Sequence, residues 1–282
     1  MMTVLKIGGE LLEGAAAMRE VAQAAAALAA RGPLVVVHGG GRAIDAELRA
    51  RHIEPKFVDG LRVTDAATLD VVIAVLAGRN NTAFVAALNA SGCRAVGLTG
   101  ADAGVGLSER AALFTTTTGD QVDLGLVGQP VGTNASLLTD LTRDGYVPVL
   151  ASIGIDAEGT VLNVNADTLA AHLAGSIGAR RLIIAGGTAG VLDGDGQPIV
   201  ELPLARVDEM IATGEAHSGM VAKLVACRGA LARGVAEVAI VSGRGVTDFD
   251  EAEGTRVGAR SKPLGPRSKP LQGRDKQMVN AR

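Results

Sequence analysis

Aromatic residues are scarce in this chain of 282 residues, which has no tryptophan, one tyrosine and four phenylalanines. Proteins that bind single-stranded nucleic acid stack the bases on aromatic side chains, so the composition argues against a nucleic-acid partner. Only two cysteines, Cys93 and Cys227, are present, and they fit neither a disulfide framework nor a metal-ligand spacing. Their apolar or small-residue surroundings indicate buried thiols, and we expect no metal site built by the protein.

Long hydrophobic runs are also missing on inspection, since none approaches the ~20 residues that span a bilayer. The start, MMTVLKIGG, has neither a cationic segment nor a long apolar segment of the kind that directs secretion. We therefore expect a cytoplasmic protein with no membrane partner. With 48% hydrophobic residues, the chain is long enough for one large α/β domain or for two lobes that share a sheet.

Charge is unevenly distributed along the chain. Residues 260–282 carry seven basic and one acidic side chain, which leaves −9 for residues 1–259 out of a formal net charge of −3. This tail contains RSKPLGPRSKPL, a near-tandem repeat with little hydrophobic periodicity. A basic tail is able to touch nucleic acid or a membrane, but its composition favours a disordered extension or an expression artefact. We exclude residues 259–282 from the fold and expect truncation after Gly258 to leave activity and thermal stability nearly unchanged.

Strand-like and helix-like segments alternate along the rest of the chain. This alternation predicts an α/β fold, a three-layer αβα sandwich with a mostly parallel central sheet. Two long segments rich in alanine and leucine, residues 15–32 and 66–92, predict helices, and the Thr- and Gly-rich residues 113–133 predict β-hairpins. Strands are expected at residues 3–9, 33–40, 93–100, 147–154, 181–187 and 235–243.

Several of the predicted strands end in glycine-rich loops, namely KIGGE, HGGGR, TGADAG and IAGGTAG. Glycine at the carboxyl end of a strand lets backbone N–H groups approach an anion with no Cβ in the way. Four such loops along one sheet edge predict a site for a polyanion, at the edge where open α/β sheets bind ligands. Each glycine pair taken alone is equally explained by a tight turn.

Two common phosphate-binding motifs are absent. The chain has no G-x-x-x-x-G-K-[ST], and VHGGGRAID does not fit G-x-G-x-x-G, which weakens a dinucleotide-binding or dehydrogenase interpretation. The cations must therefore come from elsewhere. Lys6 lies inside the first predicted strand, and Lys223 lies in HSGMVAKL, four residues after Gly219, on the first turns of a predicted helix. A lysine in an apolar strand is costly unless it meets a partner, so a purely structural ion pair is the alternative for Lys6.

Seven motifs follow one another between about Thr3 and Val257, namely KIGGELL, VVHGGGRAID, DGLRVTD, LAGRNN, GYVPVLASIGID, LNVNADTLAAHLA and HSGMVAKL. Through these motifs the chain resembles the amino acid kinase family. The combination of GLRVTD with NVNAD resembles the members whose acceptor is an acylated amino acid. The resemblance implies the amino acid kinase fold and the ATP-dependent phosphorylation of the γ-carboxylate of N-acetyl-L-glutamate in arginine biosynthesis, with Mg²⁺ accompanying ATP.

The resemblance also implies roles for individual residues. Lys6 and Lys223 match transition-state stabilisers, and Asp167 matches the carboxylate that holds both ammonium groups. Arg62 offers a planar fork for the α-carboxylate of the acceptor, with a surface salt bridge as the alternative. The expected acceptor-binding residues are Gly40, Gly41, Arg62, Asn163 and Asn165, of which the two asparagines bind the N-acetyl group or orient Asp167. The expected nucleotide-binding residues are Gly8, Gly9, Gly187, Thr188, Gly190, Val191, Leu192, Ser218 and Gly219.

Two positions depart from the family pattern. Gly187 stands where relatives usually carry an aspartate in the nucleotide lobe, and Ala101 stands at a position often occupied by lysine, although Asp102 remains. Because the two lysines and Asp167 are present, we expect a working kinase. We expect the chain to form two lobes, residues 1–180 for acceptor binding and dimerisation and residues 181–258 for nucleotide binding.

Two other functions stay open: a sibling kinase for another acylated or carrier-bound amino acid, such as 2-aminoadipate, and a catalytically silent amino-acid sensor. Arginine-inhibited relatives carry an additional N-terminal helix, whereas Lys6 is five residues from the start of this chain. We therefore expect a homodimer that is indifferent to arginine. Its predicted interface is the helical face with Val71, Val72, Val75 and Leu76, unless that face packs on the sheet.

Overall fold

The computed structural model describes residues 1–111, 113–116, 119–216 and 218–258. Its centre is an eight-stranded sheet in the order β14-β16-β15-β13-β1-β2-β10-β5. The six strands from β15 to β5 are parallel, and β16 is antiparallel to β15. The bounds are β1 (Thr3–Ile7), β2 (Leu34–His38), β5 (Ala95–Thr99), β10 (Val147–Ala151), β13 (Arg181–Gly186), β14 (Glu201–Leu202), β15 (Glu237–Ser242) and β16 (Gly254–Val257). All six strands predicted from the sequence are therefore present.

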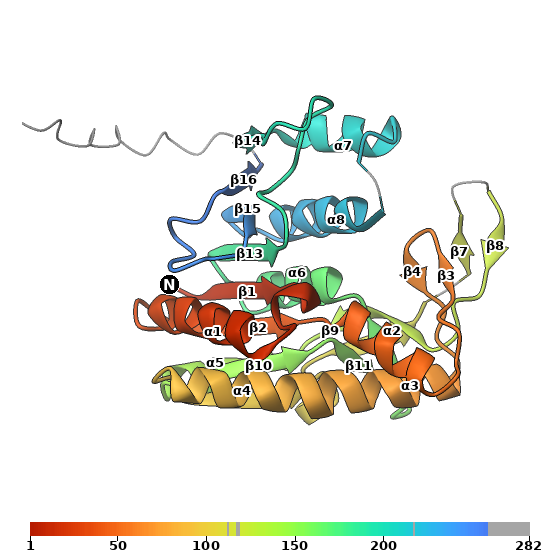
Figure 1. Cartoon of the computed structure of the whole chain (residues 1–282), viewed down its shortest axis with the longest axis horizontal. Helices are drawn as coiled ribbons and strands as arrows, with labels where there is room; N and C mark the ends of the chain where they lie inside the picture. Colours follow the sequence, from red (N-terminus) through yellow and green to blue (C-terminus); the bar gives the residue numbers. More distant parts are fainter. Residues whose placement is uncertain (112, 117–118, 217, 259–282) are drawn as a thin grey trace, which may run out of the picture.

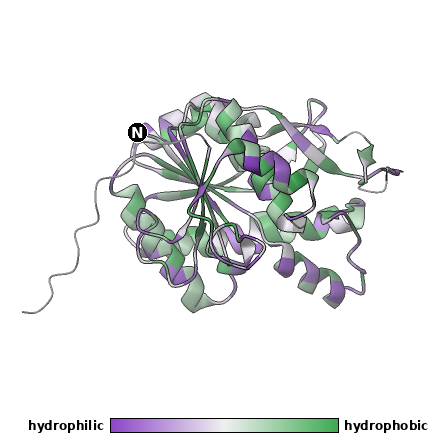
Figure 2. Cartoon of the chain, turned by 90° about the horizontal axis from the view of Figure 1, so that it is seen from above, coloured by the Kyte–Doolittle hydropathy of each residue, from purple (hydrophilic) through white to green (hydrophobic). Residues whose placement is uncertain are grey.

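Helices cover both faces of this sheet (Figures 1 and 2). On one face lie α1 (Ala15–Ala29) and α4 (Asn81–Ala90), and on the other lie α6 (Ala166–Ser176) and α8 (Ser218–Ala232). Alternate residues of a strand point to opposite faces, so Val4 packs with α6 and α8 whereas Leu5 packs with α1 and α4. The same alternation turns Lys6 toward α6. The predicted three-layer αβα sandwich is confirmed.

Two hairpins and a small barrel lie beside the sheet. The strands β3 (Phe57–Val58) and β4 (Leu61–Arg62) form one hairpin, and β7 (Phe114–Thr115) and β8 (Gln121–Val122) form the other. Figure 1 shows both hairpins at the same end of the molecule. Of the segment predicted as hairpins, the part β9 (Val127–Gly132) instead joins the barrel with β6 (Leu107–Arg110), β11 (Ile153–Ile155) and β12 (Val161–Val164). The barrel and the first hairpin were not predicted.

A continuous helix runs from Ala66 to Ala90 through α3 (Ala66–Ile73), a π-helical segment η2 (Ala74–Asn80) and α4. It is long and apolar enough to cross a membrane by length and composition, although Asp70 and Arg79 interrupt its apolar residues and no unbroken apolar run approaches 20 residues. These criteria do not distinguish a membrane span from a helix that packs on a protein core. The inner side of this helix belongs to a buried hydrophobic cluster of the protein.

The helical face predicted as a dimer interface is buried inside the protein. Its four side chains pack with Ile44 and Leu48 of α2 (Gly41–Ala50) and with Ala151 and Ile153. The interface prediction is therefore wrong, because the same apolar spacing serves a helix that packs on its own sheet and on a neighbouring helix. The four side chains are Val71, Val72, Val75 and Leu76.

The two halves of the chain share the sheet. Residues 181–258 supply β13, β14, β15 and β16, and the earlier residues supply β1, β2, β5 and β10, with β1 and β13 paired at the boundary. The thiol of Cys227 is buried and free, as expected, whereas Cys93 is free but only half-buried. The remaining helices are α5 (Ala135–Arg143) and α7 (Leu204–Ala212). The tail, residues 259–282, lies outside the described residues.

Candidate active site

The glycine loops after β1, β2 and β13 meet at one edge of the sheet. These three strands are neighbours and parallel, so their carboxyl ends lie together. The first two loops touch through their backbones, since a Cβ on Gly9 would lie 2.5 Å from the Gly40 Cα. A Cβ on Gly40 would lie 2.6 Å from the side-chain nitrogen Nδ2 of Asn80, which belongs to η2. Both positions therefore require glycine. Among the residues that the structure describes, no side chain caps the start of α2 after Gly40, and its first-turn N–H groups are suited to an anion.

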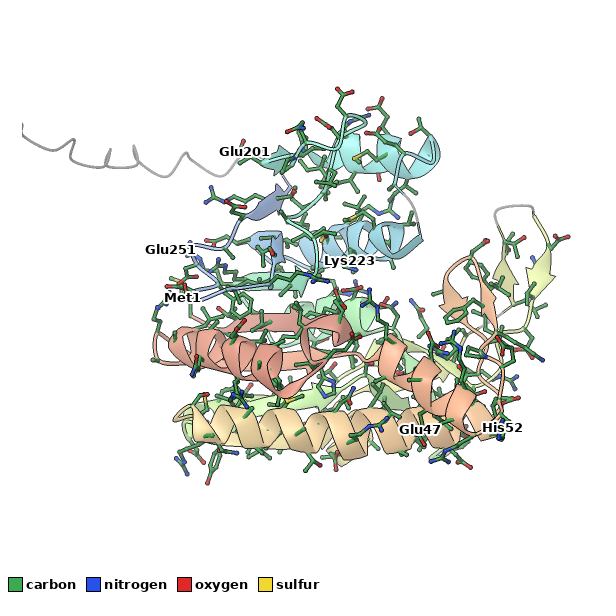
Figure 3. All side chains as sticks on the ribbon, in the orientation of Figure 1. Met1, Glu47, His52, Glu201, Lys223 and Glu251 are labelled. Atoms are coloured by element: carbon green, nitrogen blue, oxygen red, sulfur yellow. The ribbon has the colours of Figure 1, made fainter. Side chains whose placement is uncertain are left out.

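Three charged side chains converge beside these loops. Lys6 Nζ lies 2.9 Å from Asp167 Oδ1, and Lys223 Nζ lies 3.7 Å from Asp167 Oδ2. The side chains of Lys6 and Asp167 are each 7% exposed, and that of Lys223 is 19% exposed. Figure 3 shows Lys223 on α8, where the upper part of the molecule faces the lower part. The lysines come from opposite halves of the chain, and one carboxylate joins them.

The sequence fixes Asp167 through a helix cap. Asn165 precedes α6, and its Oδ1 accepts hydrogen bonds from the N–H groups of Asp167 at 2.9 Å and Thr168 at 3.1 Å. Of the two roles expected for Asn165, this geometry supports the orientation of Asp167. Two ammonium groups share one carboxylate, so the cluster keeps one uncompensated positive charge. Such a cluster attracts an anion.

Arg62 is buried in an arrangement that leaves part of its guanidinium free. Its Nη2 lies 2.6 Å from Asp45 Oδ1 and donates to the Gly41 carbonyl at 3.2 Å, and the group stacks on Phe57, 4.7 Å from the ring centre. The Arg62 side chain is 8% exposed and that of Asp45 is 21% exposed, so the salt bridge considered from the sequence is present, in a largely buried position. Nη1 is buried without a hydrogen-bond partner among the described residues. A ligand carboxylate at this position would satisfy it.

Asn163 lies close to the same segment. It sits on β12, and its Nδ2 donates to the buried Thr64 Oγ1 at 3.0 Å. Thr64 is two residues from Arg62, so this hydrogen bond ties Asn163 to the segment that carries Arg62. The predicted acceptor residues are therefore brought together, with Asn163 tied to the Arg62 segment and Asn165 tied to Asp167.

The predicted nucleotide residues from the second half of the chain form two groups, one in the loop after β13 and one at the start of α8. Gly187 N–H points to the Glu10 carboxylate, Thr188 Oγ1 donates to the Gly190 carbonyl at 3.4 Å, and Leu192 is 41% exposed. Gly190 has φ 97°, which favours glycine. Ser218 and Gly219 begin α8, and Lys223 Nζ donates to the Gly219 carbonyl at 3.4 Å.

Besides Gly187, two of the predicted residues have a backbone N–H that is already hydrogen-bonded within the protein. Gly8 N–H donates to the Ala185 carbonyl and so continues the sheet. Val191 is 1% exposed, its N–H donates to Thr255 Oγ1 and its carbonyl accepts from Ile199. Neither residue is thus placed to donate a backbone hydrogen bond to a phosphate.

A buried histidine behind the second loop was missed from the sequence. Asn81 Nδ2 lies 3.2 Å from His38 Nε2 and donates to the Val149 carbonyl at 2.9 Å, and His38 Nδ1 lies 3.2 Å from the Gly39 carbonyl. A neutral ring with its proton on Nδ1 satisfies both contacts. Burial lowers the pKa of His38 to about 4, which keeps the ring neutral near pH 7.

Both asparagines of LAGRNN point inward, at the junction of the π-helical segment and α4. A π-turn holds more residues than an α-turn, and Asn80 and Asn81 are consecutive and both buried. Asn80 contacts Gly40, and Asn81 contacts His38. The only sequence signal was the polar pair inside an apolar helix.

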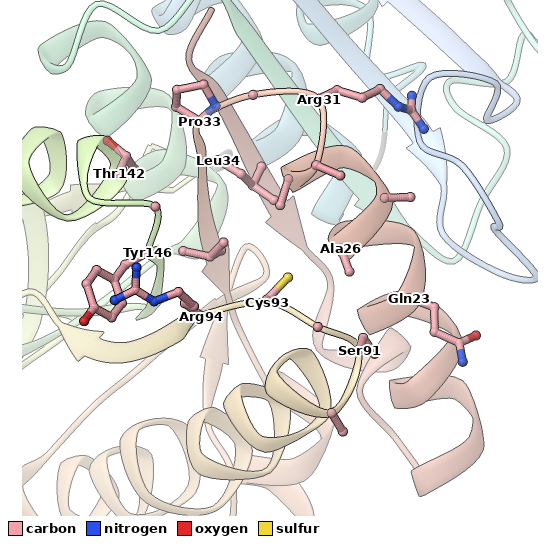
Figure 4. Close-up of a pocket in the computed structure, with 18 residues that line it drawn as sticks. Gln23, Ala26, Arg31, Pro33, Leu34, Ser91, Cys93, Arg94, Thr142 and Tyr146 are labelled. Atoms are coloured by element: carbon pink, nitrogen blue, oxygen red, sulfur yellow. The ribbon is translucent and has the colours of Figure 1, made fainter.

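A cavity of about 930 Å³ lies elsewhere, at the ends of α1, α4 and α5 (Figure 4). It is lined mainly by small residues near the start of β2 and β10, the opposite edge of the sheet. Its arginines are engaged, since Arg31 pairs with Asp248 and Asp250 and Arg94 stacks on Tyr146 at 3.9 Å. The candidate active site is therefore at the glycine loops and not in this cavity.

Known proteins share both the sequence and the fold. Residues 1–242 match the family model described as the amino acid kinase family. The acetylglutamate kinase of Sphingopyxis alaskensis is 40% identical over 246 residues, covering 86% of this chain and 82% of that protein. The acetylglutamate kinase of Methanopyrus kandleri is 39% identical over 250 residues, covering 88% and 97%.

Solved structures agree on the fold. The smu.665 protein of Streptococcus mutans superposes with a TM-score of 0.74 at 26% identity, covering 92% of this chain and 99% of that chain. The N-acetylglutamate synthase of Neisseria gonorrhoeae gives a TM-score of 0.79 at 23% identity over 93% of this chain and 60% of that chain, which supports the fold alone. Taken with the family match, these similarities show that the chain belongs to the amino acid kinase family.

Proposed function

We propose that this protein is a kinase that transfers the γ-phosphoryl group of ATP to the γ-carboxylate of N-acetyl-L-glutamate, giving N-acetyl-L-glutamyl 5-phosphate in arginine biosynthesis. The observation that carries the proposal is the bridge of Lys6 and Lys223 by Asp167 at the edge where the glycine loops meet. The similarity to acetylglutamate kinases over most of the chain supports the same acceptor.

The proposed mechanism needs no general base, because a carboxylate is already a nucleophile. The task is to align two anions that repel each other and to stabilise charge on the phosphoryl group in transfer. In our proposal Lys6 acts from the acceptor side and Lys223 from the nucleotide side, while Asp167 holds both in place. The first-turn N–H groups of α2 receive the acceptor carboxylate and the phosphoryl oxygens.

Magnesium belongs to this proposal as part of the co-substrate. Mg²⁺ is commonly bound through substrate phosphates with few protein ligands. Among the residues that the structure describes, no group of three or more His, Cys, Asp and Glu is arranged to hold a metal ion. We therefore propose that Mg²⁺ arrives with ATP.

Acceptor selectivity is assigned in the proposal to Arg62 and Asn163. The buried and unpartnered Nη1 of Arg62 is available to the α-carboxylate of the acceptor, and Asn163 lies beside the same segment. No contact in the structure favours the sibling kinase or the silent sensor over N-acetyl-L-glutamate phosphorylation.

The proposed function is tested by trapping the product. An acyl phosphate reacts with hydroxylamine to form a hydroxamate, so the protein is incubated with MgATP, hydroxylamine and one acceptor at a time: acetylglutamate, glutamate, aspartate, carbamate or carrier-bound 2-aminoadipate. Hydroxamate and ADP are expected with acetylglutamate. Turnover of carrier-bound 2-aminoadipate alone would identify the sibling kinase, and a lack of turnover with every acceptor would favour the silent sensor.

We further propose that residues 1–180 bind the acceptor, that residues 181–258 bind the nucleotide, and that the protein is a cytoplasmic homodimer. The residues first expected at the interface are buried within the protomer, so the dimer contact must use another surface. Light scattering at several concentrations tests the oligomeric state. A monomeric mass at every concentration would contradict the dimer.

A further inference from the structure

An acidic side chain lies between the two glycine loops assigned to the nucleotide phosphates. Glu10 belongs to the short helix η1 (Gly9–Leu11) after β1, and its Oε1 accepts the Gly187 N–H at 2.9 Å. Its carboxylate fills the space beside Gly8, where a Cβ would lie 2.5 to 2.7 Å from the carboxylate atoms. The carboxylate therefore joins the loop after β1 to the loop after β13, across the two halves of the chain.

The surroundings of this carboxylate suit an anion. A Cβ on Gly186 would lie 3.5 Å from Glu10 Oε1 and 3.7 Å from Lys223 Cε. A Cβ on Gly187 would lie 3.2 and 3.3 Å from two guanidinium nitrogens of Arg244. The Gly187 N–H, Lys223 and Arg244 thus surround one position, and the glycines beside it have no Cβ that would obstruct a ligand. These are groups that bind phosphate oxygens.

The attachment of Glu10 is weak compared with that of Asp167. Within the described part of the chain, Glu10 makes no ion pair shorter than 4.0 Å, and its one strong contact is the Gly187 N–H. Asp167, in contrast, meets two lysines. The glutamate side chain is also long and only half-buried, so it is able to rotate away without opening the core.

From these contacts we infer that Glu10 is an internal competitor of the nucleotide phosphates. In the free protein its carboxylate occupies the Gly187 N–H, and a phosphate oxygen of ATP or ADP takes that donor when the nucleotide binds. A phosphate and a carboxylate cannot share one N–H, and their charges repel at this distance. Glu10 therefore sets nucleotide affinity. This inference rests on the proposed function only in assigning the site to a nucleotide.

The inference is tested by titrating ADP into the full chain without acceptor, by calorimetry, once with Mg²⁺ and once with a chelator. Glu10→Ala removes the competing anion and is expected to tighten ADP binding about tenfold, as for the loss of one charge-assisted hydrogen bond. Glu10→Gln keeps the shape but not the charge, and a gain of about threefold is expected. Both gains are expected with and without Mg²⁺, because the competition is for a backbone donor.

Glu13→Gln is the matched control. It removes the same charge three residues away, from an exposed side chain whose nearest cation is Arg42 at 3.5 Å, and it is expected to leave ADP binding unchanged. Unchanged or weaker ADP binding in both Glu10 variants would overturn the inference. Weakening only in the presence of Mg²⁺ would also overturn it and would place Glu10 on the metal of the bound nucleotide.

Two further controls keep the outcomes distinct. Thermal melts check that each variant is folded, and Glu10→Gln decides the result if Glu10→Ala does not fold. Hydroxamate formation with acetylglutamate is measured in parallel. Its absence would contradict the proposed function, but it would leave the ADP titrations as a valid test of Glu10.

Discussion

Replacing Lys6 by methionine separates catalysis from stability. The change keeps an apolar stem of similar length and removes one charge from a pair whose side chains are each 7% exposed. Breaking a buried pair on one side costs ~3–5 kcal/mol, because the other charge is left uncompensated. Lys223 stays 3.7 Å from Asp167, so we expect the lower end, about 3 kcal/mol of unfolding free energy. This corresponds to a fall in Tm of roughly 6 °C or more.

The second variant, Lys6→Met with Asp167→Asn, removes both buried charges. Most of the lost unfolding free energy should return, because no buried carboxylate remains without its partner and Lys223 is partly open to solvent. Activity should not return. Loss of one preorganised charge stabiliser lowers kcat by ~100- to 1000-fold, and neutralising the second group restores nothing.

Urea melts and steady-state kinetics with acetylglutamate and MgATP measure both quantities. Lys56→Met is the stability control, since Lys56 is exposed, and a change below ~0.5 kcal/mol is expected there. A Lys6→Met variant with near-normal kcat would remove Lys6 from the mechanism. A double variant as unstable as the single variant would show that the ion pair is not the source of the loss.

Three other predictions concern the acceptor loop. Arg62→Lys should raise KM for acetylglutamate at least tenfold with little change in KM for ATP, because lysine cannot keep the ion pair with Asp45 and also bind a carboxylate with a planar fork. Equal effects on the KM of both substrates in steady-state kinetics would make Arg62 structural. Burial lowers the pKa of His38 from 6.5 to about 4, so the unfolding free energy present above pH 6.5 should fall by about 3 kcal/mol in total as the pH drops toward 4. Urea melts at pH 7 and pH 4.5 should therefore show a smaller loss of unfolding free energy in His38→Gln than in the unchanged protein. An equal loss in both would refute this cause. Gly40→Ala should lower kcat/KM and Tm, because its Cβ would lie 2.6 Å from Asn80, and an unchanged enzyme would show that the loop moves freely.

The parts of the fold that follow from simple periodicity were predictable. Six parallel strands and the helices over 15–32 and 66–92 are each marked by an apolar pattern that one face of a sheet or helix explains. The barrel of β6, β9, β11 and β12 was not, because its strands are short and pair across long stretches of sequence. The dimer face was misassigned for a related reason. An apolar helical stripe looks the same whether it meets a second copy or its own sheet.

In the site, the residues alone pointed to Lys6 and Lys223 as cations and showed that a lysine in an apolar strand needs a partner. That Asp167 is this partner was implied by the resemblance to the family. The tertiary partners of Arg62 and His38 were not predicted. Asp45 beside Arg62 and Asn81 beside His38 are separated by 17 and 43 residues, and no local pattern reports such pairs. Local sequence patterns thus do not report the side chains that contact Arg62 and His38 across the fold.

The two carboxylates of the site differ in how firmly they are held, and this difference assigns their roles. Asp167 is fixed by two lysines and by the Asn165 cap, so it is suited to keep two cations at constant separation through a reaction cycle. Glu10 is held by one N–H, and its removal from that donor exposes a group that a phosphate needs. A fixed carboxylate preorganises the charge that stabilises the transition state, whereas a displaceable one adjusts the affinity for the nucleotide. Because the first acts on kcat and the second on nucleotide binding, variants at the two positions should separate in steady-state kinetics.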